Sequence, residues 1–481
     1  MAHTATAPSR SAEIRRQLGH PVLDGDGHVV ELLPVFLDYA RDRGHGELVD
    51  RLVRRRSIED LSLDDRRRGG ILPHSWHVPA STEYYATVTS PGRYHDRLEE
   101  AGIDFAVIYP TMGISFLQLL DDEQRVTLCR LYNEHMAEQF APYGDRFTMA
   151  ALVPMHTPDE AIAALEHARS LGAKVGLIAS HVHRPLPGAP LTTDDELADL
   201  RVGEWETRGW IDTFGIDSPH DYDPVWAKAI ELGLPLAAHT AGIGASDRAS
   251  ISNFVFNQIG HFAAAGGALA KSLFLGGVPA RFPRLRLALL EGGAAIGTQI
   301  YVSLADTWKK RGGDAIARLD PQLLDRERVA ELLVERDPSL ARYSAEQLAG
   351  HAGMTRARDD FAAAKITSVE DIRDQFCSSF AWGCEADDAL VGVAFDQRVT
   401  PLGALVPSFF ASDLGHWDVP EFDEPLEEAY ELVERGILDL DQLRAFVFDN
   451  PVRFYGSLNA DFFAGTAIEA EAAAVLREVG P

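Results

Sequence analysis

The chain has 481 residues, of which 46% are hydrophobic, enough to bury a sizeable core. It carries 45 basic and 73 acidic residues, and the resulting formal net charge of −28 argues against nucleic acid and anionic membranes as partners, because both need a basic face. No paired cysteine framework, bilayer-length apolar stretch or secretory apolar region is evident, so we expect a cytoplasmic protein.

Short apolar runs recur along the chain, and most are followed by a segment with helical features. They cover residues 22–28, 103–110, 147–155, 174–181, 234–239, 285–291, 376–383 and 406–413. A short apolar run that stops at glycine, proline or a charge is typical of a buried strand. Strands that alternate with helices pair in parallel, so the sequence predicts an α/β protein, a (β/α)8 TIM barrel with long helical insertions. A doubly wound sheet is the alternative architecture.

The predicted barrel extends over residues 20–456, between an N-terminal tail (1–19) and a C-terminal tail (457–481). Long structureless loops are rare in compact domains, so we expect the insertions to carry structure, the first of them over the barrel mouth. The last insertion is charged and helix-rich and fits either a lid or a subunit contact. The insertions lie at about 29–100, 182–222, 240–284 and 307–370.

Polar residues close four of the predicted strands. Asp26 and His28 end the first strand, His239 the fifth, Glu291 the sixth and Asp413 the eighth. The C-terminal ends of barrel strands meet on one face, so these side chains are predicted to converge there. A buried carboxylate is costly unless something pairs with it, and a metal ion is one candidate. Imidazole is the commonest side-chain metal ligand, which makes the two histidines suitable companions.

Each of these residues also has an ordinary structural interpretation. His239 alone fits a core histidine, Asp413 fits a helix N-cap, and Glu291 fits an ion pair with Arg286 or with a basic residue of the first insertion. Other histidines either reach the same site or lie elsewhere, and the sequence leaves both options open. They are His181 and His183 after the fourth strand, His261 between the fifth and sixth strands, and His416 at the rim.

These residues resemble those of the amidohydrolase-related metal-dependent TIM barrels, in the branch of the aminocarboxymuconate semialdehyde decarboxylases. The similarity rests on Asp26-Gly27-His28, on LPLAAH at 234–239 and on Ser412-Asp413, and it extends from about residue 20 to 456. In those decarboxylases the sixth strand ends in a histidine that activates the metal-bound water. This chain has Glu291 there, which makes the expected ligand set richer in carboxylates.

Residues 272–293 and 410–420 resemble a sub-branch that includes the TIM-barrel non-haem diiron monooxygenases of platensimycin and platencin biosynthesis. That resemblance implies dioxygen activation and hydroxylation of an apolar acid or its CoA thioester. Our leading hypothesis is a monooxygenase with iron, two ions per site, held by the strand-end residues together with His261 or His181. Glu291, Asp413 and His239 would then act in catalysis.

The alternative hypothesis is a hydrolase or decarboxylase that holds one zinc or manganese ion and uses a metal-activated water. Glu291 would then be the general base. A third hypothesis is a barrel that binds a ligand without catalysis. We expect a small-molecule substrate in the first two cases, and the sequence leaves a homo-oligomer open.

Overall fold

The computed structural model describes residues 8–53, 62–69, 78–185, 209–240, 250–350 and 359–479. Its centre is an eight-stranded sheet in the order β1-β2-β3-β4-β7-β8-β9-β10, in which neighbouring strands pair in parallel. The predicted (β/α)8 barrel of the α/β class is therefore confirmed. The strands are β1 (Leu23–Val29), β2 (Phe105–Pro110), β3 (Phe147–Leu152), β4 (Val175–Ile178), β7 (Leu236–Ala238), β8 (Leu287–Leu289), β9 (Phe380–Glu385) and β10 (Ser408–Ala411).

The barrel strands are buried along nearly their whole length, as expected where helices cover one face and the barrel interior the other. This accounts for their continuous apolar sequences. A separate antiparallel ribbon joins β5 (Val182–Pro185) to β6 (Gly209–Asp212) within the predicted insertion at 182–222. The remainder of that insertion, 186–208, lies outside the described residues.

The first and last strands meet where the barrel closes. His28 N donates to Leu414 O at 2.8 Å, and Asp413 N donates to Asp26 O at 3.0 Å. The register of β1 against β2 shifts between Asp24 and Gly27, as at a β-bulge, and such irregularities re-aim side chains. The ends of β1 and β10 are thereby fixed beside each other.

Helices between the strands surround the barrel, and their starts are set by local sequence. Thr157, for example, accepts a hydrogen bond from Glu160 N, and Pro158 occupies the first turn that follows. These helices are α7 (Asp122–Phe140), α8 (Pro158–Ser170), α10 (Asp223–Leu232), α12 (His261–Leu275), α13 (Val278–Arg281), α14 (Ala294–Arg311), α17 (Val369–Ser379), α18 (Gly392–Phe395), α19 (Pro425–Glu434), α20 (Leu440–Arg444) and α21 (Asn450–Gly456).

The first insertion carries helices, as expected from its length. Tyr84, on α5, accepts a hydrogen bond from Gly415 N at 2.9 Å, so this insertion reaches the residues that follow β10. The helices of the two insertions after β1 and β7 are α2 (Leu33–Asp42), α3 (Gly46–Val53), α4 (Leu63–Gly69), α5 (Thr82–Val88), α6 (Pro91–Arg97) and α11 (Phe254–Gln258).

Two segments differ from the sequence-based expectation. The seventh strand runs from Phe380 to Glu385 instead of 376–383, because Ser368 and Asp371 form a capping box that starts α17 and the helix continues to Ser379. The segment predicted as a C-terminal tail carries a helix, α22 (Glu469–Val479), in contact with α21. In the N-terminal segment, Ser9 caps α1 (Arg10–Leu18).

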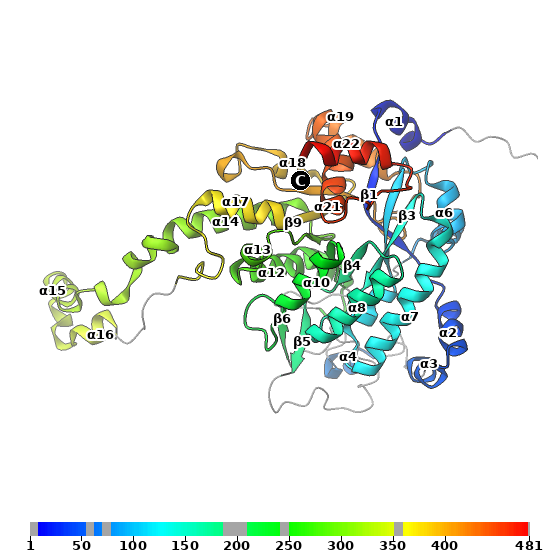
Figure 1. Ribbon diagram of the computed structural model, residues 1–481. Helices are drawn as coiled ribbons and strands as arrows, with labels where there is room; N and C mark the ends of the chain where they lie inside the picture. Colours follow the sequence, from blue (N-terminus) through cyan, green and yellow to red (C-terminus); the bar gives the residue numbers. More distant parts are fainter. Residues whose placement is uncertain are drawn as a thin grey trace, which may run out of the picture.

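The insertion between α14 and α17 leaves the barrel as an arm, whose outermost helices α15 (Arg326–Arg336) and α16 (Ala345–Ala349) lie far from the sheet (Figure 1). Three short 3-10 helices complete it: η5 (Gly313–Leu319), η6 (Pro321–Leu323) and η7 (Pro338–Arg342). Within the described ranges, no helix has both the length and the apolar character needed to cross a bilayer.

Candidate metal centre

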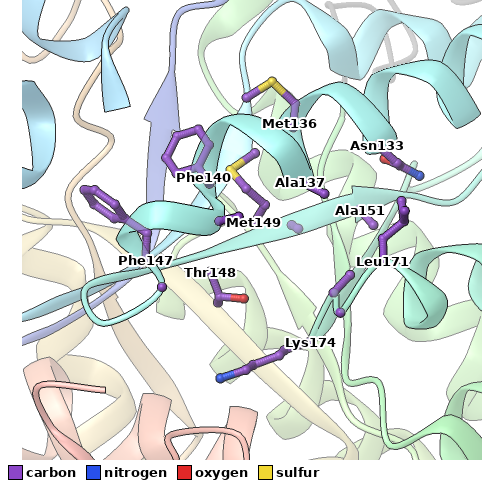
Figure 2. Close-up of a pocket in the computed structure, with 15 residues that line it drawn as sticks. Asn133, Met136, Ala137, Phe140, Phe147, Thr148, Met149, Ala151, Leu171 and Lys174 are labelled. Carbon is purple, nitrogen blue, oxygen red and sulfur yellow. The ribbon is translucent and has the colours of Figure 1, made fainter. Parts of the chain in front are cut away.

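A pocket on the outer wall of the barrel is unsuited to catalysis. Figure 2 shows it between α7 and β3, with Phe140, Met149 and Lys174 among its lining residues. Lys174 immediately precedes β4, so the pocket opens near the N-terminal ends of the strands. Its lining is mainly apolar, and the ammonium of Lys174 already donates to Phe462 O. The chemistry must therefore be sought at the opposite end of the barrel.

The strand-end residues do converge there. Asp26, His28, His239 and Glu291 form one group whose candidate ligand atoms all lie within 4.8 Å of one another. A second group meets the same limit and shares two members with the first: His28, Glu291, Asp413 and His416. Six residues from β1 and from the ends of β7, β8 and β10 thus make one continuous cluster.

The contacts within the cluster are close. His239 Nε2 lies 2.8 Å from Glu291 Oε1, and His416 Nδ1 lies 2.5 Å from Asp413 Oδ1. His28 Nε2 is central, at 3.5 Å from Asp26 Oδ1, 3.6 Å from Glu291 Oε1 and 3.4 Å from Asp413 Oδ1. Three carboxylates therefore surround one imidazole nitrogen.

The donor set fits a divalent cation. Both carboxylate oxygens of Asp26 and the Nε2 atom of His28 are buried, and none of the three makes a hydrogen bond. Orphaned polar atoms of this kind are rare in a native interior, and an ion is one of the partners that explains them. Imidazole and carboxylate together suit zinc, manganese or iron.

Hydrogen bonds at the Nδ1 atoms orient two of the imidazoles. His28 Nδ1 lies 3.3 Å from Pro110 O, and His239 Nδ1 lies 3.2 Å from Thr240 O. A carbonyl accepts a hydrogen bond, so each Nδ1 carries its proton and each Nε2 is directed into the cluster. Metal-ligating histidines are usually held in this way.

Burial and charge pull the pKa values of the cluster in different directions. Burial lowers the pKa of His28, but Asp26 and Glu291 outweigh it and raise that pKa to about 10. Burial raises the pKa of Glu291, but His239 and His28 outweigh it and hold that pKa well below its usual value. Burial raises the pKa of Asp413 well above its usual range, with Glu291 adding to the shift. A positive charge is therefore favoured at the centre.

The backbone is strained at two of these positions. Glu291 and Asp413 have φ angles of 52° and 51°, in the left-handed region that residues other than glycine rarely adopt. Such conformations persist where surrounding structure fixes them, and they gather at functional sites. Here they turn the chain sharply just after β8 and β10, which places both carboxylates in the cluster.

His181 and His261 lie outside both donor groups. His181 follows β4, and burial lowers its pKa to about 3, with His183 and His261 adding to the effect. His261 opens α12 and is buried beside Phe262, whose ring is 5.5 Å from that of His239. Metal binding by His181 or His261 stays a prediction.

Sequence reasoning missed two carboxylates near the cluster. Glu385 ends β9, and burial raises its pKa well above the usual value, with Glu291 and Asp418 contributing. Asp24 is fully buried and accepts hydrogen bonds from Ser412 and from Asp26 N. Glu385 carries the same signal as the other strand-end residues, a charge that closes an apolar run. Asp24 carries no such signal.

The family follows from a comparison with known sequences. The model of the family described as amidohydrolase matches residues 83–339, more than half of the chain. The chain belongs to the amidohydrolase family. With its buried cluster of imidazoles and carboxylates, this amidohydrolase is a metal-dependent enzyme.

Solved structures are similar to this amidohydrolase over most of their length. A 5-carboxyvanillate decarboxylase from Sphingomonas paucimobilis has 16% identity and a TM-score of 0.51, over 90% of this chain and 98% of that one. An amidohydrolase from Mycobacterium avium subsp. paratuberculosis K-10 has 16% identity and a TM-score of 0.49, over 91% and 100%. A manganese-bound dihydroxybenzoic acid decarboxylase from Polaromonas sp. JS666 has 15% identity and a TM-score of 0.47, over 92% and 99%.

The family match supports the broad family resemblance but gives no support to the narrower one. The matched family model does not point to iron or to a diiron monooxygenase. Membership of that sub-branch therefore stays a prediction.

Proposed function

We propose that this amidohydrolase is a hydrolase or decarboxylase that depends on one divalent metal ion and acts on a small organic acid or its derivative. The observation that carries the proposal is the fully buried carboxylate of Asp26, which lies 3.5 Å from His28 Nε2 without a well-formed hydrogen bond to it. Family membership supports the reaction class. Decarboxylation is one chemistry that this fold supports, as the Sphingomonas enzyme illustrates.

Asp26, His28, His239 and Glu291 would hold the ion. When bound, a zinc or manganese ion polarises an oxygen of the substrate and brings the pKa of a coordinated water close to neutrality. Glu291 is fixed by His239 at 2.8 Å, so its carboxylate is better suited to holding the ion than to moving during the reaction.

Asp413 is better placed to move a proton. Its Oδ1 atom lies 2.5 Å from His416 Nδ1, and the His416 side chain is 17% exposed, the most exposed of the six residues. A proton accepted at Asp413 Oδ1 therefore has a neighbouring base through which it can leave the buried site. We assign Asp413 as the general base and His416 as its proton partner.

The test is turnover of the full chain after loading with zinc or manganese, against amides, lactones and aromatic carboxylic acids in water enriched in heavy oxygen. Heavy oxygen in the product identifies hydrolysis, and release of carbon dioxide identifies decarboxylation. We expect one of the two, abolished by a chelator and restored by the metal. Turnover that persists in the metal-free chain would overturn the proposal.

A second candidate is the iron-dependent monooxygenase acting on an apolar acid or its CoA thioester. One observation favours it: the two donor groups overlap at His28 and Glu291, so the six residues offer enough ligands for two ions. Assays of the iron-loaded chain with acyl-CoA substrates, with and without dioxygen, test it. Strict dependence on dioxygen is expected, and equal turnover without dioxygen contradicts it.

A further inference from the structure

A group of histidines that the proposed reaction does not use lies beside the metal centre. His156 follows β3, whereas His181 and His183 follow β4 and have rings 5.2 Å apart. Gln118, at the end of η2 (Gly113–Gln118), donates from Nε2 to His181 O at 3.0 Å. His183 is one of the groups that lower the pKa of His156, so these two imidazoles are neighbours. We call these four residues the histidine cluster.

Polar atoms of the histidine cluster lack partners within the protein. Both ring nitrogens of His156 and the Oε1 atom of Gln118 are buried and make no hydrogen bond with any described residue. His156 is 8% exposed and Gln118 is 1% exposed. Burying polar groups without hydrogen bonds costs free energy, and a native interior leaves few of them. Either a bound molecule or ordered water must satisfy these atoms.

The histidine cluster adjoins a proposed metal ligand. His239 N donates to Ile178 O at 3.0 Å, where β7 pairs with β4. Just beyond, the hydroxyl of Thr240 donates to Ser180 Oγ at 2.9 Å. His181 directly follows Ser180, as Thr240 directly follows His239. The cluster and the metal centre therefore lie at the same ends of neighbouring strands, and a substrate that extends across the barrel mouth contacts both.

The imidazoles of the histidine cluster are neutral. Burial lowers the pKa of His181 to about 3 and that of His156 to about 2, and it also lowers the pKa of His183. A neutral imidazole offers one N–H donor and one acceptor nitrogen, and Gln118 Oε1 adds an acceptor. A hydroxyl group also both donates and accepts a hydrogen bond, so it matches this set of atoms.

The two cations that act on the pKa of His156 are already engaged. Arg184 donates to Asp212 Oδ2 at 3.0 Å and to His156 O at 2.7 Å. Arg125 is paired with Glu160 at 2.6 Å, and its side chain is almost fully buried. A carboxylate of a ligand would therefore be buried here without a counter-charge, which is costly. The cluster favours an uncharged polar group over an acidic one.

We propose that the histidine cluster recognises a hydroxyl group of the substrate, at a position remote from the group that reacts at the metal centre. The substrate is then an organic acid, or a derivative of one, whose far end carries a hydroxyl and no second carboxylate. This inference rests on the proposed function only for the place where the substrate binds, and it applies equally to hydrolysis and to decarboxylation.

Binding of simple acids to the zinc-loaded full chain tests the proposal without relying on turnover. The probes are straight-chain carboxylic acids of graded length that end in a hydroxyl, a methyl or a second carboxylate. The graded length lets the far end reach the histidine cluster from a carboxylate held at the metal. Titration calorimetry gives the dissociation constant of each probe.

Two variants remove hydrogen-bonding atoms from the cluster and keep an aromatic ring: His156→Phe and the less buried His183→Phe. The matched control is His135→Phe. His135 is also 8% exposed, and its Nδ1 makes no hydrogen bond with a described residue, but it packs against Tyr39, between α7 and α2. Circular dichroism melting shows which variants fold, and elemental analysis shows which retain zinc.

We expect a hydroxyl-ended acid of suitable length to bind roughly tenfold more tightly than its methyl-ended and carboxylate-ended counterparts. Each folded cluster variant should lose most of this preference, and the control should keep it. Equal affinities for the three end groups, or no binding of any probe, would overturn the proposal and leave water as the partner of the buried atoms. A preference that survives in the folded cluster variants, or that the control loses equally, would also overturn it.

The outcome is separable from that of the proposed function. A hydroxyl preference that depends on the cluster, in a chain without metal-dependent turnover, would support this inference while the proposed function fails. Metal-dependent turnover without any hydroxyl preference would overturn this inference alone.

Discussion

Ser412 donates two hydrogen bonds to the buried carboxylate of Asp24, from its amide to Oδ1 at 2.9 Å and from its hydroxyl to Oδ2 at 2.6 Å. Asp24 Oδ1 also accepts from Asp26 N at 3.1 Å. The carboxylate of Asp24 therefore ties the first strand to the last. Asp24 lies two positions before Asp26, and Ser412 lies one position before Asp413. The Asp24 carboxylate orients Asp26, a proposed ligand, and Asp413, the proposed general base, without itself belonging to the donor groups.

The substitution Asp24→Asn tests this positioning role. An amide cannot accept all three hydrogen bonds, because one of its two polar atoms is a donor. We expect metal affinity to fall by about 10- to 100-fold, as for other residues that orient ligands, while the chain stays folded. Chelator competition measures the affinity.

Asp212→Asn is the matched control. Asp212 is equally buried and accepts hydrogen bonds from Arg184, Ser218 and Phe214, but it belongs to the β5–β6 ribbon. It should lose stability without losing metal affinity. Equal losses of affinity in the two variants would show that Asp24 acts only through general stability.

Glu291 and Glu385 close neighbouring strands and should respond differently to replacement by glutamine. The pKa of Glu291 is well below its usual value, so Glu291→Gln removes a negative charge from the cluster. Burial and nearby carboxylates raise the pKa of Glu385, so Glu385→Gln changes the charge of the site less than Glu291→Gln does.

We expect the Glu291→Gln variant to bind metal up to about 100-fold more weakly and the Glu385→Gln variant to bind like the unmodified chain. Elemental analysis after dialysis against a weak chelator measures how much metal each variant retains. Full metal retention in the Glu291→Gln variant would remove Glu291 from the ligand set.

The pH dependence of metal binding should reflect His28. Its pKa in the metal-free protein is raised to about 10, so it carries a proton at pH 7, and a ligating imidazole must lose that proton. Metal affinity should therefore rise with pH up to about 10. The stability of the metal-free fold changes with pH in the opposite direction. The raised pKa of His28 contributes stability that is fully present below pH 6.5 and is lost as the pH approaches 10.

Titration calorimetry in buffers of different ionisation enthalpy counts the protons released. About one proton per ion is expected from His28 at pH 7. Binding without proton release, and with no dependence on pH, would mean that His28 is neutral or is not a ligand.

Gly25 lies at the bulge of β1, where no larger residue fits. A Cβ atom there would lie 2.5 Å from the ring of Phe409. Gly25→Ala should therefore destabilise the fold by about 1–3 kcal/mol, the usual range for overpacking. Gly46→Ala is the control, because a Cβ atom at Gly46 meets nothing within 4 Å. Chemical denaturation measures both, and equal stabilities would contradict the packing argument.

The barrel and the cluster could largely be predicted, because the signals are local. A buried strand leaves an apolar run, and His239, Glu291 and Asp413 each close one. Asp24 could not be identified, since its role depends on the β-bulge and on a contact with Ser412 across 388 positions. The positive φ angles at Glu291 and Asp413 likewise arise from tertiary packing.

The seventh strand and the arm show where local signals mislead or end. Residues 376–379, FCSS, precede the apolar run directly, but they belong to α17, which begins at the capping box of Ser368, so Glu385 was missed as a strand end. The charged, helix-rich composition of 312–350 predicted helices correctly. Composition contains no information on the direction of the arm.

The most direct measurement is the metal content of the full chain purified without added metal, beside that of Asp26→Asn/His239→Ala. Elemental analysis should find about one zinc or manganese ion per chain, and roughly a tenth of that or less in the folded variant. Two iron ions per chain would support the monooxygenase instead. No divalent metal in the unmodified chain even after incubation with zinc, manganese and iron, or the same content in the variant, would contradict the assignment of this cluster as a metal centre.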